Sequence, residues 1–129
     1  MLNIALEPDG EATSIKDISR REGISVAYLE QLLNKLRHDG LIESIRGPKG
    51  GYILSKGASE ITVADVVRTL EGGIYPIRCM DAQKNGHSIC KKNKGCAPGI
   101  VWHKLAKAIN DCLESVTLKD LCAEAKRIG

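Results

Sequence analysis

The strongest constraint on the fold is an apolar pattern in the segment SVAYLEQLLNKLRHDG, residues 25–40. Leucines recur there at i, i+3, i+4 and i+7, on one face of a helix: they are Leu29, Leu32, Leu33 and Leu36. Ser25 is a typical N-cap in front of this helix, and Gly40 is typical of the residue just beyond its end. The pattern predicts an amphipathic helix with one buried face.

A shorter helix is predicted immediately before it, over IKDISRRE. Ser14 and Asp17 have the spacing of a loose capping box, and Gly23 is a stop signal. Two helices joined by a short turn that contains a glycine form the outline of a helix-turn-helix.

A β-hairpin is predicted after the second helix. The runs LIESI and YILS favour strands, and the intervening RGPKGG holds three glycines and a proline. A hairpin directly after a helix-turn-helix is a wing, so the chain is expected to fold as a winged helix-turn-helix.

The rest of the chain is predicted to be helical apart from one cysteine-rich segment. Thr62 and Asp65 form a capping box for VADVVRTLE, which Gly72 ends, and Thr117 and Asp120 start a short last helix. Between them a long helix is expected over residues 99–116, with Pro98 at its first position. The fold class is therefore mainly α with a small β-hairpin. We expect a DNA-binding domain over residues 1–73, a cysteine-rich loop over 74–97, and a dimerisation helix plus a short helix over 98–129.

The long helix carries more apolar surface than its neighbours are expected to cover. Its apolar side runs through Val101, Leu105, Ala108, Cys112 and Val116. We expect part of this stripe to be the seam of a homodimer; the alternative is that it packs entirely within its own subunit. Cys112 and Cys122 lie at apolar helical positions, where small buried thiols are expected.

The exposed side of the second helix is expected to enter the major groove of DNA, which admits a helix. Glutamine can bond adenine, alanine can touch a thymine methyl, and hydroxyls reach phosphates or bases. The candidates are Ser25, Ala27, Tyr28, Gln31 and Lys35. Glu30 on the same helix either accepts from a cytosine amino group, disfavours other sequences, or points to solvent.

The turn of the hairpin is expected to contact DNA as well. It offers two cations beside residues that allow close backbone approach and stiffen the tip: Arg46, Gly47, Pro48 and Lys49. An arginine inserted into a narrow minor groove reads DNA shape. The alternative for this turn alone is a soluble hairpin loop.

The segment RCMDAQKNGHSICKKNKGC places Cys79, Cys90 and Cys96 among lysines, with ten and then five intervening residues. Residues 78–107 carry a surplus of six positive charges, twice the net charge of +3 of the whole chain. Thiolates suit iron–sulphur clusters and zinc alike, and neighbouring lysines favour thiolates. Reactive thiols and inert loop cysteines are the alternatives that this spacing leaves open.

Composition narrows the remaining possibilities. With three Tyr, one Trp and no Phe, stacking of single-stranded bases on aromatic side chains is disfavoured. No signal peptide, transit peptide or membrane span is evident, so a cytoplasmic protein is expected, where cysteines are thiols or ligands.

Together these motifs resemble the bacterial winged helix-turn-helix regulators that include IscR, NsrR and CymR. The matching features, in order, are YLEQL, the RGPxGGY wing, the I-T-x-x-D-V-x-x-x-L-E-G helix, the cysteine segment, Trp102 and the ending VTLKDL. The resemblance covers nearly the whole chain. Family members usually start with a longer first helix, so we expect either that the N-terminal segment is shortened here or that the given sequence starts inside that helix.

The resemblance implies a homodimer that binds a near-palindromic double-stranded DNA operator and holds a 2Fe–2S cluster. It implies Cys79, Cys90 and Cys96 as ligands, although the first gap is about five residues longer than is usual in the family. Where IscR-like members have a histidine ligand, this chain has Gly99. His87, His103 or a residue of the partner subunit are the candidates for the fourth ligand.

The function expected from all of this is transcription regulation, as a repressor, controlled by iron–sulphur status, nitric oxide or redox state. The alternative is a thiol-redox or zinc-dependent regulator or interaction protein without a cluster. Cys96 and His103 are the only pair that suggests an enzyme, and no third group orients them. We therefore expect a protein that is not an enzyme, with no small-molecule substrate and no membrane partner.

Overall fold

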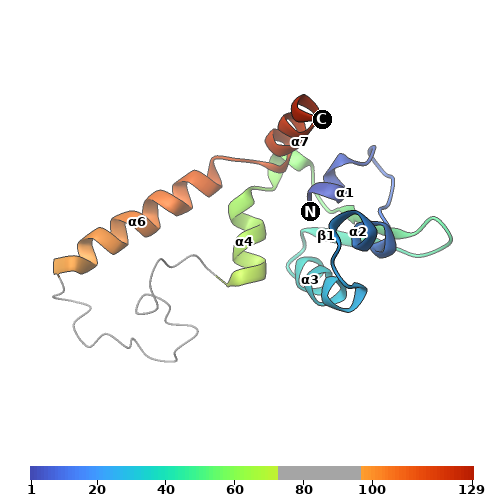
Figure 1. The fold of residues 1–129 in the computed structure, drawn as a ribbon, viewed down its shortest axis with the longest axis horizontal. Helices are drawn as coiled ribbons and strands as arrows, with labels where there is room; N and C mark the ends of the chain where they lie inside the picture. The colour runs from blue at the N-terminus through green and yellow to red at the C-terminus, as the bar shows by residue number, and fades with distance from the viewer. Residues whose placement is uncertain (73–96) are drawn as a thin grey trace.

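The computed structural model describes residues 1–72 and 97–129, and they form six α-helices and one hairpin (Figure 1). The first helices are α1 (Leu2–Leu6), α2 (Ile15–Glu22) and α3 (Val26–His38). The strands β1 (Ile42–Ile45) and β2 (Gly51–Leu54) follow. A 3₁₀ helix η1 (Ala58–Glu60) leads to α4 (Val63–Glu71), and after the undescribed residues come α6 (Ala97–Glu114) and α7 (Leu118–Ile128). The expected fold class, a mainly α winged helix-turn-helix, is confirmed.

Most helix ends lie where the capping residues predict them. Ser14 and Ser25 accept hydrogen bonds from backbone N–H groups in the first turns of α2 and α3. Thr62 and Thr117 each form a complete capping box. The strands pair antiparallel, with Ile42 opposite Leu54 and Ile45 opposite Gly51. These local signals therefore specify the order and the limits of the elements.

The long helix differs from its prediction by two residues at each end. It covers Ala97–Glu114 rather than residues 99–116. Just beyond its C-terminal end, the carbonyl of Val116 accepts a hydrogen bond from Val63 N–H at 2.9 Å. A long-range backbone contact thus ends this helix, and no local pattern announces it.

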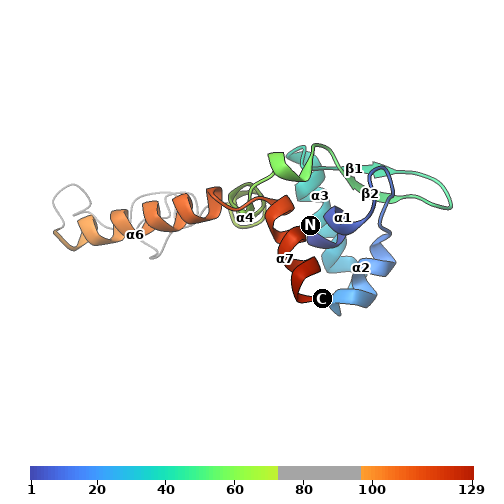
Figure 2. The same cartoon turned by 90° about the horizontal axis from the view of Figure 1, so that it is seen from above.

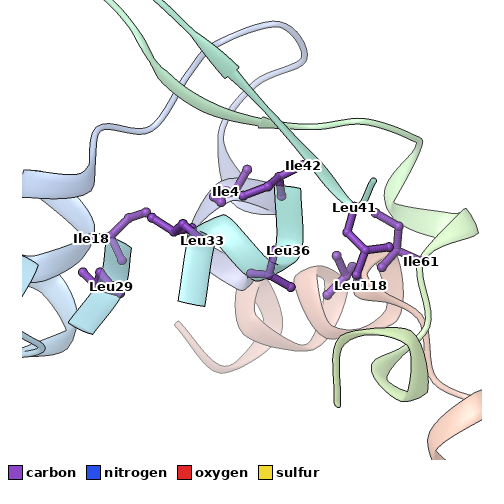
Figure 3. Close-up of a cluster of buried hydrophobic side chains, with 9 residues drawn as sticks. All are labelled: Ile4, Ile18, Leu29, Leu33, Leu36, Leu41, Ile42, Ile61 and Leu118. Atoms are coloured by element: carbon purple, nitrogen blue, oxygen red, sulfur yellow. The ribbon is translucent and has the colours of Figure 1, made fainter. Parts of the chain in front are cut away.

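A single buried cluster joins the elements at the two ends of the described chain (Figure 3). Leu33 and Leu36 of α3 lie in it together with Ile4 of α1, Ile42 of β1 and Leu118 of α7. Burying such side chains contributes about 1.5–3 kcal/mol each. In both views α6 projects from this body as an arm, while α7 returns beside α1 (Figures 1 and 2).

None of the helices within the two described ranges is long and apolar enough to cross a membrane.

Candidate nucleic-acid interface

The turn between α2 and α3 is held by three local features. Gly23 adopts a left-handed conformation with φ of 67° and ends α2, and its N–H donates to Ser19 O. The hydroxyl of Ser19 donates to the carbonyl of Ile24 at 2.6 Å. Ser25 then caps α3, accepting from Tyr28 N–H at 3.2 Å. These bonds fix the angle between the two helices of the helix-turn-helix.

The inner face of α3 is anchored in the core. Leu29, Leu33 and Leu36 are all at most 5% exposed, and the helix contacts α2, β1 and α4. Because these leucines occupy one side, the opposite side of α3 is left to solvent. This is the side that a helix-turn-helix presents to the major groove.

All five predicted DNA-facing residues are exposed, four of them on α3 and Ser25 at its N-cap. Tyr28 is 54% exposed, and the remaining four are also exposed: Ser25, Ala27, Gln31 and Lys35. The structure therefore places them together on one accessible helix surface. Glu30 is exposed as well, which is compatible with each of its three interpretations.

Two further exposed residues of α3 were not among those predicted from the sequence. Asn34 lies three residues after Gln31, and Arg37 donates to its side-chain oxygen at 3.4 Å. Their position could have been predicted from the sequence, since residues three and four apart share a helix face. They extend the exposed polar surface of α3 toward its C-terminal end.

The four predicted wing residues are exposed at the tip of the hairpin: Arg46, Gly47, Pro48 and Lys49. Gly50 N–H donates to Gly47 O at 2.9 Å, and Gly47 has φ of 117°, so the turn is tight. A hollow of about 660 Å³ separates the wing tip from the start of α2. The tip therefore projects from the body (Figure 1).

The base of the wing is tied to the segment that precedes α2. Thr13 N–H donates to Tyr52 O at 3.0 Å, and Tyr52 N–H donates to Thr13 O at 2.9 Å. Next to this pair, a Cβ on Gly51 would lie 2.3 Å from Thr13 O. The sequence did not predict this contact, because backbone pairing between distant segments has no local signature.

The charges at this surface are available for an anionic partner. Ion pairs occupy Arg20, Arg21, Arg68 and Arg127. By contrast, Arg37 and Arg46 have no carboxylate partner among the described residues. These two arginines lie on α3 and on the wing tip, so the surface carries cations that are not neutralised within the described chain.

The arm α6 carries an exposed apolar stripe. Ile100 is 60% exposed, Val101 61% and Leu105 41%. The expectation of a buried thiol is wrong for Cys112, which is exposed on this helix, whereas Cys122 of α7 is half-buried. Cys112 shares the exposed side because no element among residues 1–72 and 97–129 covers that side.

The three predicted cluster ligands, Cys79, Cys90 and Cys96, lie outside the described residues, and so does His87. His103 lies on α6 and is exposed. Within residues 1–72 and 97–129 no group of three His, Cys, Asp or Glu side chains could hold a metal ion. The assignment of the cysteines to a cluster therefore remains a prediction.

Comparison with known proteins gives a consistent result. The family model of Rrf2, described as iron-dependent transcriptional regulator, matches residues 1–124. The HTH-type transcriptional regulator IscR of Photorhabdus laumondii is 40% identical over 121 residues, covering 94% of this chain and 71% of the relative. IscR of Escherichia coli is 37% identical, with 94% and 72% covered.

Solved structures of two regulators have the same fold. CymR, the global cysteine regulator of B. subtilis, aligns with a TM-score of 0.74 and 33% identity, covering 95% of this chain and 87% of that chain. IscR of T. potens aligns with a TM-score of 0.74 and 33% identity, covering 96% and 78%. These proteins are regulators and not enzymes, as expected from the sequence of this chain. The chain is a transcriptional regulator and belongs to the Rrf2 family.

Proposed function

We propose that the protein acts as a homodimeric repressor that binds a near-palindromic DNA operator, with a 2Fe–2S cluster controlling its affinity. In this proposal residues 1–73 bind DNA, residues 74–97 hold the cluster, and residues 98–129 supply the dimer contact. The observation that carries the DNA-binding part is the shared exposure of the outer face of α3 and the wing tip, with unpaired cations on both.

The outer face of α3 supplies the contacts to base edges in the major groove. Gln31 can donate to and accept from one adenine, and the Ala27 methyl group can pack on a thymine methyl. Ser25 uses its oxygen to cap α3 and still has a hydroxyl hydrogen to donate to a phosphate. Lys35, in the last turn, adds a phosphate contact.

The wing supplies contacts beside the groove that α3 occupies. Arg46 and Lys49 sit on a turn whose glycine lets the backbone approach DNA closely. A narrow minor groove concentrates negative potential, which attracts an arginine side chain. Each phosphate contact releases counterions, so the affinity is expected to fall steeply with salt.

A second copy of the chain is proposed to cover the exposed stripe of α6. Ile100, Val101 and Leu105 would then be removed from water, which is favourable at about 25 cal/mol per Å² of apolar area. A dimer places two recognition helices on two half-sites, as a near-palindromic operator requires.

The cluster proposal rests on the chemistry of the sequence and on the family. Three thiolates suit a 2Fe–2S cluster, and the family is described as iron-dependent. His87, His103 and a residue of the partner subunit remain candidates for the fourth ligand. A ligand other than cysteine raises the potential of such a cluster, which suits a sensor of iron–sulphur status, nitric oxide or oxidants.

A cluster-free regulator is the second candidate, because CymR, the global cysteine regulator of B. subtilis, aligns with the same TM-score as IscR of T. potens. In that case the thiols would bind zinc or react with oxidants. A cytoplasmic location, where thiols stay reduced, suits both candidates.

DNA binding is tested with a duplex that the wild-type protein selects from a random library. Gln31→Ala is expected to weaken binding by about 1–3 kcal/mol and to relax specificity at one position. Arg46→Ala is expected to lower affinity most on duplexes with a narrow minor groove. Lys126→Ala, on the exposed side of α7, is the control and should bind as the wild type does. Equal affinities for all four proteins would refute the proposed interface.

The cluster is tested on protein purified without oxygen, by its visible spectrum and by counting iron and sulphide. We expect a coloured protein, with the colour lost in Cys79→Ala, Cys90→Ala or Cys96→Ala and kept in Cys112→Ala. Colourless protein with stoichiometric zinc would instead support the second candidate. DNA binding is measured in a separate experiment, so neither result of the cluster test decides whether α3 and the wing contact DNA.

A further inference from the structure

Two segments with the same pattern meet where the arm α6 joins the body. One is Ile61-Thr62-Val63-Ala64-Asp65, at the start of α4, and the other is Val116-Thr117-Leu118-Lys119-Asp120, at the start of α7. Each has a threonine N-cap between two branched apolar residues and an aspartate three positions later. The repetition is not explained by DNA contact, because neither segment lies on α3 or on the wing.

Both segments make the same capping bonds. Thr62 Oγ1 accepts from Asp65 N–H at 3.1 Å, and Asp65 Oδ2 accepts from Thr62 N–H at 3.0 Å. The corresponding bonds between Thr117 and Asp120 are 3.2 and 2.9 Å long. Each threonine is therefore held in an extended conformation, and the backbone groups of the residues beside it are left to pair with the other segment.

The two caps pair with each other in an antiparallel bridge between Thr62 and Thr117. Val63 N–H donates to Val116 O at 2.9 Å, and Leu118 N–H donates to Ile61 O at 2.9 Å. Residues 61, 62 and 63 thus face residues 118, 117 and 116, and the two segments exchange equivalent bonds. We name this pair of bridged caps, residues 61–65 and 116–120, the cap joint.

The cap joint is packed against the DNA-binding half. Ile61 and Ala64 are 0% exposed and Leu118 is 2% exposed. In Figure 3, Ile61 and Leu118 lie beside Leu41, with Leu36 of α3 close by in the same buried cluster. A displacement of the joint would therefore press on the helix that carries the DNA-facing residues.

A second tie between the arm and the body is weaker. Arg68 of α4 pairs with Glu114 of α6, but these side chains are 44% and 49% exposed. Exposed ion pairs contribute little to stability. The direction of α6 relative to the body is therefore set mainly by the cap joint and by the packing of α6 on α4.

We infer that the cap joint sets the half-site spacing that the dimer recognises, with Thr62 and Thr117 as positioning residues. This inference rests on the proposed dimer through α6. The helix has 18 residues and is roughly 27 Å long. A rotation of roughly 10° at the joint moves its far end by about 5 Å, more than one base-pair step of about 3.4 Å. Without the bridge, Ser115 and Val116 would form a two-residue linker, and only the packing of α6 on α4 and the exposed Arg68–Glu114 pair would still hold the direction of α6.

The test compares duplexes whose two half-sites are moved apart or together by one base pair. The wild type is expected to prefer one spacing. Thr62→Val and Thr117→Val each remove one cap oxygen while keeping the side-chain shape. Either change is expected to reduce the ratio of affinities for the preferred and the shifted spacing by about fivefold. This is the factor that corresponds to the free energy of one lost N-cap. Thr62→Ser and Thr117→Ser keep the hydroxyl and should keep the preference.

Ser14→Ala is the matched control, because it removes an N-cap hydroxyl from α2, outside the joint. It is expected to lower stability to a similar degree and to leave the ratio of affinities unchanged. All variants are compared well below the lowest melting temperature. An unchanged spacing preference in both valine variants would overturn the inference and leave the proposed function standing. Failure of the wild type to bind any of these duplexes would instead refute the proposed function.

Amide hydrogen exchange gives a second measurement that needs no DNA. Since the caps share their backbone bonds, Thr117→Val should speed exchange of Val63 N–H in α4, and Thr62→Val should speed exchange of Leu118 N–H in α7. The expected increase is about fivefold in each case. Exchange that rises only in the helix carrying the substitution would contradict a shared joint.

Discussion

At the scale of single residues, Gly51 shows how the wing is attached. The strand β2 passes so close to Thr13 that a side chain at position 51 would overlap the backbone carbonyl, 2.3 Å from an added Cβ. Its φ of 151° is also rarely adopted by residues with a side chain. Glycine is therefore required here for contact with the body, whereas the glycines of the tip serve the turn.

Gly51→Ala is expected to destabilise the protein by about 1–3 kcal/mol, because either the bridge between Thr13 and Tyr52 or the wing must move. Urea unfolding measures this. Gly57→Ala is the control, since Gly57 has φ of −59° and its nearest atom is 3.8 Å away, and its effect should stay within about 0.5 kcal/mol. Equal stabilities of the two variants would contradict the close approach.

Asp120, in the capping box of α7, makes the stability of the folded state depend on pH. The backbone and side-chain hydrogen bonds from Thr117 lower the pKa of Asp120 below its ordinary value of 3.8. The carboxylate therefore stabilises the folded state above that ordinary value, and this contribution is lost as the pH falls through the lowered pKa.

Asp120→Asn is accordingly expected to flatten the decline of stability as the pH falls from above the ordinary pKa of 3.8 through the lowered pKa, since it removes one group that binds a proton more readily in the unfolded chain. Urea unfolding across this range, with Asp9→Asn as the charge-matched control, checks the slope. The assignment of this pH dependence to Asp120 would be contradicted if stability declined with pH in Asp120→Asn as in the wild type and declined less steeply in Asp9→Asn.

At the scale of elements, local signals predicted most of the structure. Serine and threonine caps and the glycine stops at Gly23 and Gly72 specified where helices begin and end, because these signals act within one turn. The end of α6 and the burial of Cys112 were predicted wrongly. The end of α6 depends on a contact with a distant segment, and the exposure of Cys112 depends on the lack of a covering element. The periodicity of the sequence indicates neither.

The exposed stripe of α6 gives a prediction for the dimer. Leu105→Glu places a charge among apolar side chains and is expected to produce a monomer of 14.0 kDa, measured by light scattering. Lys126→Glu changes an exposed residue of α7, outside this stripe, and should leave the mass at twice that value. A wild type that is itself monomeric at micromolar concentration would contradict the proposed seam.

At the scale of the whole molecule, the buried core belongs to the body, and α6 projects from it as an arm. One core joins α1, α3, the root of the wing and α7, so the recognition helix is held rigidly. The interface on α3 and the wing was predictable because exposed polar residues follow directly from the buried leucine stripe. The cysteine ligands were predicted from chemistry and resemblance, and they stay a prediction.

Two copies of this body are proposed to bind DNA together. The most direct measurement is selection from a random duplex library by anaerobically purified protein, followed by sequencing. We expect two inverted half-sites with centres about one helical turn, roughly 34 Å, or a multiple of it apart. Enrichment of a single unrepeated site, or of no sequence at all, would contradict the account.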